Sequence, residues 1–221
     1  MIPLDYSYMI MNLFFLAGWL FFFLKLKEIR KELTLISVGL GVMGIFLNVI
    51  YIRDWWMPLT LSGNIPAIED FLYAFAKGGF AMGLFCWISG KTKKAEIDYN
   101  KYGAIIGIVL GLFLVLHFFF GLNTFITTTA ILVLGLMRIY YKRPETIKSS
   151  LITGALFLAA SIIIYNLVEI LTPGWLGFWY FENVPEIVIL KMPLDDLIYY
   201  PLFGAAIGPI YEYLKLRSLN K

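Results

Sequence analysis

The feature that most constrains this chain is a succession of apolar runs, each close to the roughly 20 residues with which a helix crosses a bilayer. Seven such runs cover residues 6–24, 33–52, 67–88, 102–120, 124–141, 150–171 and 194–214. Only 15% of the residues are charged and 60% are hydrophobic, whereas soluble domains carry about 25% charged residues. The sequence therefore predicts an all-α integral membrane protein with seven transmembrane helices and excludes an ordinary soluble domain.

The basic residues predict the orientation of these helices. They gather in segments 25–31, 91–101, 142–148 and 215–221, whereas the alternate connections contain only Arg53 and Lys191. The positive-inside rule then places the amino terminus outside and the carboxyl terminus in the cytoplasm, and we expect the cell (plasma) membrane. The basic loops account for the net charge of +3, so we expect no nucleic-acid partner.

Two segments on the outer side share one pattern, in which a proline and two acidic residues lead into an apolar run. The first is "IPAIEDFLY" at 65–73 and the second is "KMPLDDLIYY" at 191–200. We therefore predict a single membrane domain over 1–221 that contains two parallel three-helix repeats, 1–89 and 122–221. A linker helix within 90–121 would join them, as in proteins that build one site between two repeats.

The paired acids have two interpretations. Acidic residues at a helix amino terminus are common caps that complement the helix dipole, and for either pair alone capping is as good an explanation as function. Two pairs at one depth of the membrane favour function, because ionisable residues within membrane helices usually face the bundle interior and mark a site.

The segment Pro193–Tyr200 resembles the P-x-E-E-x-x-F-F signature of the membrane-integral lycopene cyclase domain family, the heterodimeric or fused type of bacteria, archaea and fungi. Pro66, Glu69 and Asp70 resemble a first copy with one extra residue after the proline. The seven-helix layout is also similar to the related small membrane terpene cyclases of meroterpenoid pathways. Here the second copy carries Asp-Asp where the family favours Glu-Glu. The resemblance implies ring closure of a polyene end, started by a proton and without redox chemistry, cofactor or metal. It implies four catalytic acids: Glu69, Asp70, Asp195 and Asp196.

Other side chains are candidates for binding the substrate. Tyr73, Tyr199 and Tyr200 each lie four residues after one of the acids, on the same helix face, and aromatic faces stabilise cations. Lys77 lies two turns beyond Asp70 and would favour the ionised form of that acid; a structural ion pair or a lysine that snorkels to the interface explains it equally well. Asn166 and Glu169 lie near the outer end of the sixth run.

The predicted function is a lycopene-cyclase-like isoprenoid or carotenoid cyclase, of the intramolecular lyase or isomerase type. Two alternatives stay open: a small-solute or proton-coupled transporter of 3+1+3 helix architecture, and a carotenoid- or lipid-binding membrane protein without catalysis. The expected partners are a hydrophobic isoprenoid or carotenoid and the lipid bilayer, and a homo-oligomer stays open. One cysteine, Cys86, excludes a cysteine-rich metal site.

Overall fold

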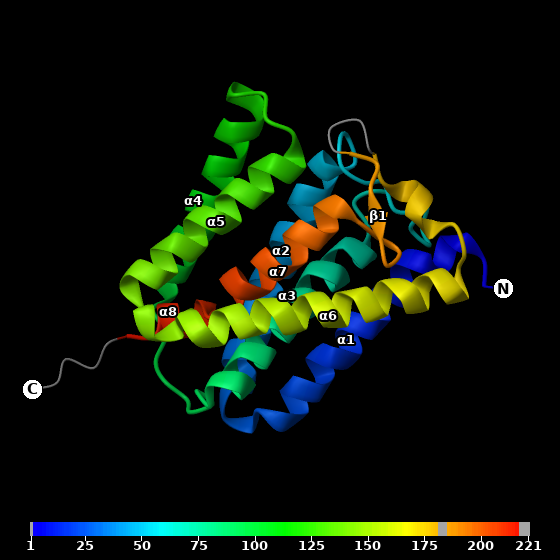
Figure 1. Cartoon of the computed structure of the whole chain (residues 1–221). Helices are drawn as coiled ribbons and strands as arrows, with labels where there is room; N and C mark the ends of the chain where they lie inside the picture. The colour runs from blue at the N-terminus through cyan, green and yellow to red at the C-terminus, as the bar shows by residue number, and fades with distance from the viewer. Residues whose placement is uncertain (1, 181–184, 217–221) are drawn as a thin grey trace, which may run out of the picture.

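The computed structural model of the chain describes residues 2–180 and 185–216 and is helical almost throughout (Figure 1). The helices of the described residues are α1 (Ser7–Lys25), α2 (Arg30–Tyr51), α3 (Ile68–Ser89), α4 (Tyr99–Leu114), α5 (Thr124–Lys142), α6 (Ile147–Leu171), α7 (Leu194–Ile207) and α8 (Ile210–Leu214). A π-helical turn, Val115–Phe119, extends α4. Two-residue strands β1 (Val188–Ile189) and β2 (Met192–Pro193) pair in antiparallel fashion just before α7. The predicted all-α class is confirmed.

Six helices of the described part are long and apolar enough to cross a membrane. They are α1 to α6, extended by short helical turns at some ends. Large apolar side chains also point outward along them, and Phe119 and Ile170 are 81% and 71% exposed. Such a surface suits contact with lipid chains rather than with water. The chain is an integral membrane protein.

The seventh predicted helix, 194–214, is interrupted in the structure. It ends at Ile207, and α8 begins at Ile210, after Gly208 and Pro209. Proline has no backbone N–H to continue the helical ladder. With 14 residues, α7 is about 21 Å long, and it packs among α3, α5 and α6 rather than at the lipid-facing surface (Figure 1).

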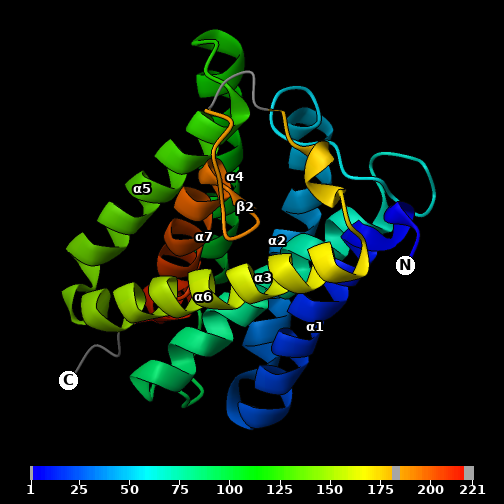
Figure 2. The ribbon, with the colours of Figure 1, turned by 45° about the vertical axis from the view of Figure 1, so that its right-hand side comes forward.

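The two ends of the bundle differ in their residues. At one end, which we call the acidic end, α3 and α7 begin, and the loops before them are joined by backbone hydrogen bonds from Met57 N to Phe178 O (2.7 Å) and from Tyr180 N to Trp55 O (2.8 Å). At the other end the basic loops lie together, and Leu216 N donates to Glu96 O (3.0 Å). The start of α1 and the end of α8 lie on opposite sides of the molecule (Figures 1 and 2). The orientation of these ends in the membrane stays a prediction.

Glycines allow close helix packing next to the acids. A Cβ at Gly44 of α2 would meet the backbone oxygen of Asp70 at 2.9 Å, and a Cβ at Gly154 of α6 would meet the backbone oxygen of Pro201 at 2.6 Å. Small residues at such crossings let membrane helices approach to backbone contact. They hold α2 against α3, and α6 against α7, at the depth of the candidate site.

Candidate active site

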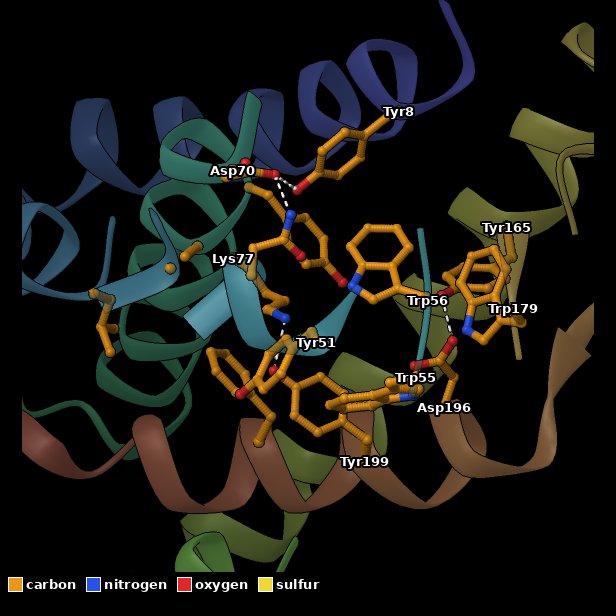
Figure 3. Close-up of a pocket in the computed structure, with 16 residues that line it drawn as sticks. Tyr8, Tyr51, Trp55, Trp56, Asp70, Lys77, Tyr165, Trp179, Asp196 and Tyr199 are labelled. Atoms are coloured by element: carbon orange, nitrogen blue, oxygen red, sulfur yellow. Dashed lines mark hydrogen bonds between the residues drawn. The ribbon is translucent and has the colours of Figure 1, made fainter. Parts of the chain in front are cut away.

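A pocket lies near the acidic end, between α1, α2, α3, α6 and α7 (Figure 3). Three ionisable side chains other than tyrosine line it, namely Asp70, Lys77 and Asp196. The remaining wall is mostly aromatic, from Tyr8, Tyr51, Trp55, Trp56, Tyr73, Tyr165, Trp179, Tyr199 and Phe203. A chamber of this composition suits an apolar ligand and presents a few charges to one part of it.

Asp70 is anchored in the first turn of α3 and is 1% exposed. Its Oδ2 accepts a hydrogen bond from the backbone N–H of Ala67 (2.8 Å), so it caps the helix, as one of the two interpretations predicted. Its Oδ1 accepts from Tyr8 Oη (3.1 Å) and from Asn48 Nδ2 (2.7 Å). Three donors from three parts of the chain therefore fix this carboxyl group at the pocket wall. Asp70 thus both caps α3 and lines the pocket.

Asp196, in the first turn of α7, has a different environment. It is 4% exposed, and its Oδ2 accepts a hydrogen bond from Tyr165 Oη of α6 (2.7 Å). Tyr200 Oη lies 3.4 Å from Tyr165 Oη and 2.6 Å from Tyr73 Oη. These contacts form a hydrogen-bonded chain, Asp196–Tyr165–Tyr200–Tyr73, which connects α7, α6 and α3. Figure 3 shows Asp70 and Asp196 at opposite ends of the labelled set, with Trp56 between them.

Lys77 is enclosed by aromatic rings and is 4% exposed. Its Nζ lies 4.0 Å from the ring centroid of Tyr73, 4.5 Å from that of Tyr199 and 4.6 Å from that of Phe203. It donates a hydrogen bond to Tyr199 Oη (2.7 Å). Within residues 2–180 and 185–216, none of the salt bridges involves Lys77. The lysine therefore neither snorkels to the interface nor forms the ion pair with Asp70 that the helix spacing suggested; ring faces and a hydroxyl surround its amino group instead.

The other two predicted catalytic acids point away from the pocket. Glu69 is 1% exposed, and its Oε1 accepts from the backbone N–H of Leu61 (2.7 Å), which fastens the loop before α3. Asp195 Oδ2 accepts from Trp55 Nε1 (2.5 Å), and its Oδ1 is buried without a partner. Adjacent residues on a helix are rotated by about 100°. Of the four acids, Asp70 and Asp196 line the pocket and Glu69 and Asp195 do not, so the four acids do not meet in one chamber.

The predicted substrate-binding residues fall into two groups. Tyr73, Lys77 and Tyr199 line the pocket, and Tyr200 lies behind the wall, in the tyrosine chain. The structure does not bring Asn166 and Glu169 to the pocket. Asn166 Nδ2 donates to the backbone oxygen of Leu190 (2.9 Å), and Glu169 pairs with Lys191 (3.7 Å). Both hold the hairpin before α7 in place.

Several lining residues were not among the predicted site residues. Tyr8 in α1 and Tyr165 in α6 each donate to one of the two acids, and Trp56 and Trp179 pack on each other with ring centroids 5.4 Å apart. In the sequence these tyrosines stand alone in apolar helices that contain many aromatics, and nothing marks them. The adjacent residues Trp55 and Trp56, just before the first acidic segment, could have indicated the aromatic lining of the pocket. Within the described residues no group of three His, Cys, Asp or Glu side chains is placed to hold a metal ion.

Comparison with known proteins supports one family. A family model described as lycopene cyclase matches residues 123–214, which contain α5 to α8, Tyr165 and both acids of the second pair. This match confirms the resemblance to the lycopene cyclase domain for the second acidic segment, and the first segment, 65–73, lies outside it. No curated protein and no solved structure matched the chain.

Proposed function

From the lycopene cyclase match of residues 123–214, we propose that this protein closes a ring at the end of an isoprenoid polyene, by proton addition and proton removal without net redox change. The observation that carries the proposal is the pocket itself. One buried acid from each acidic segment, Asp70 and Asp196, lies in a largely aromatic chamber inside the membrane domain. The match supports a carotenoid-cyclase-like activity, and the steps below are our proposal for the residues.

The hydrogen bonds indicate different roles for the two acids. Asp70 accepts three hydrogen bonds, which suits a carboxylate, whereas Asp196 accepts from the side chains of Tyr165 and Trp179 and lies next to a second acid, Asp195, which disfavours another negative charge there. We assign Asp196 as the proton donor. Its O–H bond breaks as a new C–H bond forms at the polyene end, and the electron pair of the attacked double bond supplies that bond.

The resulting cation closes the ring through a second double bond. Tyr8, Trp56 and Tyr73 pack edge-on or tilted against one another at the pocket wall, with centroids 5.0 to 5.7 Å apart. Their faces supply negative electrostatic potential without a nucleophile, worth about 0.5–2 kcal/mol per close ring. The Asp70 carboxylate then accepts a proton from carbon, a new double bond forms, and the product is an isomer of the substrate. Before the next turnover Asp70 gives up this proton and Asp196 takes one up, which restores the starting state.

Lys77 keeps the charge of the pocket balanced through this cycle. With Lys77 as ammonium, Asp70 ionised and Asp196 protonated, the charges of the three side chains cancel. After proton donation the substrate cation balances Asp196, and after proton removal the neutral Asp70 leaves Lys77 balanced by Asp196. Burying an uncompensated charge is costly. A pocket whose net charge stays at zero avoids that cost at every step.

The test is expression in a host that accumulates lycopene, with absorbance and mass measured in the extracts. We expect a product of equal mass and altered absorption. Asp196→Asn should abolish this product, whereas the neighbouring Asp195→Asn should retain it, because an asparagine oxygen can still accept from Trp55. If Asp196→Asn forms product at the wild-type rate, Asp196 is not the proton donor. Unmodified pigment that purifies with the wild-type protein would indicate a binding protein instead.

A further inference from the structure

A cavity lined largely by basic side chains lies at the end of the bundle opposite the acidic end. Its cations are Lys101 near the start of α4, Arg138, Lys142 and Arg143 near the end of α5, and Lys215 just after α8. Here α8 packs against both α4 and α5 (Figure 1). This cavity, which we call the basic cavity, shares no lining residue with the acidic pocket.

The basic cavity holds an excess of positive charge. Asp98 is the one acid among the described residues that line it, and its Oδ1 accepts the backbone N–H of Lys101 (2.9 Å) as the cap of α4. Glu212 pairs with Lys215, and Glu145 lies 4.0 Å from Arg143. The cations that line the cavity outnumber these three acids together. An anion would therefore be attracted to this cavity.

Contacts with the protein hold several of these cations in place. Lys101 Nζ donates to the backbone oxygen of Tyr213 and lies 3.6 Å from the centroid of that ring. Arg143 Nη2 donates to the backbone oxygen of Lys215 (3.1 Å), and Lys215 Nζ lies 4.3 Å from the ring centroid of Tyr211. Carbonyl oxygens and ring faces orient a cation without cancelling its charge. Side chains ordered in this way lose less entropy when a ligand binds.

The helix surfaces next to the basic cavity are apolar and exposed. On α5, Leu134 lies one turn before Arg138 and is 52% exposed, and the neighbouring Met137 is 63% exposed. On α4, Ile108 lies two turns beyond Lys101, on the same face, and is 60% exposed. A cluster of cations at the end of the membrane helices thus continues directly into a surface that suits lipid chains.

We infer that the basic cavity binds the phosphate headgroup of an anionic phospholipid, whose acyl chains lie along the exposed apolar faces of α4 and α5. Guanidinium and ammonium groups are the side chains that bind phosphate oxygens most strongly, and basic pockets between membrane helices bind lipid headgroups. A zwitterionic headgroup would bring its own positive charge into the cavity and bind less well. This inference does not depend on the proposed function.

Arg138 and Lys142 offer the sharpest test, because both are exposed and their substitution should leave the fold intact. Arg138→Gln combined with Lys142→Gln removes two charges and keeps polar side chains of similar length. Lys93→Gln combined with Lys94→Gln is the matched control, since these lysines are equally exposed, belong to a basic loop at the same end and do not line the basic cavity. Arg138→Lys combined with Lys142→Arg keeps both charges.

The measurement is the dissociation constant of the purified chain in detergent, from native mass spectrometry, for phosphatidylglycerol, for phosphatidylcholine with the same acyl chains, and for inorganic phosphate. We expect the wild type to bind phosphatidylglycerol more tightly than the other two. Each basic residue near an anionic lipid contributes about fivefold to affinity. The glutamine pair at 138 and 142 should therefore bind phosphatidylglycerol about 25-fold more weakly, with the control and the charge-retaining pair unchanged.

Four results would overturn the inference. Unchanged phosphatidylglycerol binding in the glutamine pair at 138 and 142 would exclude the cavity, and an equal loss in the control would show a general effect of surface charge. An equal loss in the charge-retaining pair would show that charge is not the cause. Phosphatidylcholine or inorganic phosphate binding as tightly as phosphatidylglycerol would exclude an anionic lipid as the preferred occupant.

Discussion

The hydroxyl group of Tyr165 donates a hydrogen bond of 2.7 Å to Asp196 and so joins α6 to the first turn of α7 inside the pocket. Both residues are almost completely buried, and Tyr165 also contacts Tyr200, which continues the chain to Tyr73. In the proposed reaction Asp196 becomes negative when it gives up its proton. Tyr165 stabilises that charge and is therefore a positioning residue for the donor.

The first prediction is that Tyr165→Phe slows ring closure by about 10- to 150-fold, because a hydrogen bond to a charged group contributes about 1.5–3 kcal/mol. Substrate binding should change little, since the ring and its packing on Trp175 remain. Steady-state kinetics with lycopene separate these effects, and we expect kcat to fall while KM stays constant. Tyr140→Phe, which removes a hydroxyl bonded to Ser150 outside the pocket, is the control. An equal loss in both variants would show that the effect of Tyr165 is structural.

The second prediction concerns the buried amino group of Lys77. Lys77→Met keeps the length and apolar packing of the side chain but removes the positive charge, so the pocket is left with an uncompensated carboxylate. An unpaired buried charge costs about 3–5 kcal/mol. We therefore expect a loss of ring closure of 100-fold or more, with an elution profile in detergent like that of the wild type.

The measurement is product formed per molecule of purified protein, compared with thermal unfolding of the same sample. Lys101→Met serves as the control because Lys101 also packs over a tyrosine ring, at 3.6 Å from the centroid of Tyr213, and lies outside the pocket. Activity of Lys77→Met at the wild-type level would refute the charge balance that we propose, even if the acids themselves proved essential.

Much of the fold was predictable because helices in a bilayer must satisfy their own backbone hydrogen bonds, so apolar length alone indicates them. For residues 194–214 the structure is helical as predicted but contains a break, which the sequence did not indicate because a short interruption such as Gly208–Pro209 hardly alters the apolar pattern. The proline and acidic residues lie beside the pocket, and one acid of each pair lines it. The sequence did not indicate which acid of each pair faces it, because this depends on how α3 and α7 are rotated against their neighbouring helices, which is a property of the tertiary packing.

The hydrogen-bond partners of the acids were harder to predict, because they come from neighbouring helices and depend on how those helices pack. Asn48 donates to Asp70, yet an asparagine within an apolar run is equally typical of hydrogen bonding between helices. An ion pair between Lys77 and Asp70 was one of the open interpretations, and it is not among the salt bridges of the described residues, although the two residues lie seven positions apart on one helix. Tyr199 from α7 and the ring of Tyr73 enclose the amino group instead, and contacts across a helix interface cannot be read from spacing along one chain.

The third prediction tests the crossing that holds Tyr165 against Asp196. A Cβ at Gly154 would meet the backbone oxygen of Pro201 at 2.6 Å and the side chain of Ala205 at 3.2 Å. Because backbone cannot yield as a flexible side chain does, Gly154→Val should push α6 away from α7. Such overpacking costs about 1–3 kcal/mol. We expect a lower unfolding temperature in detergent, and loss of activity beyond what the stability change explains. Gly103→Val in α4, where an added Cβ meets no atom within 4 Å, should leave both properties unchanged. If Gly154→Val lowers the unfolding temperature but the protein that remains folded cyclises at the wild-type rate, the distance between α6 and α7 does not control the donor.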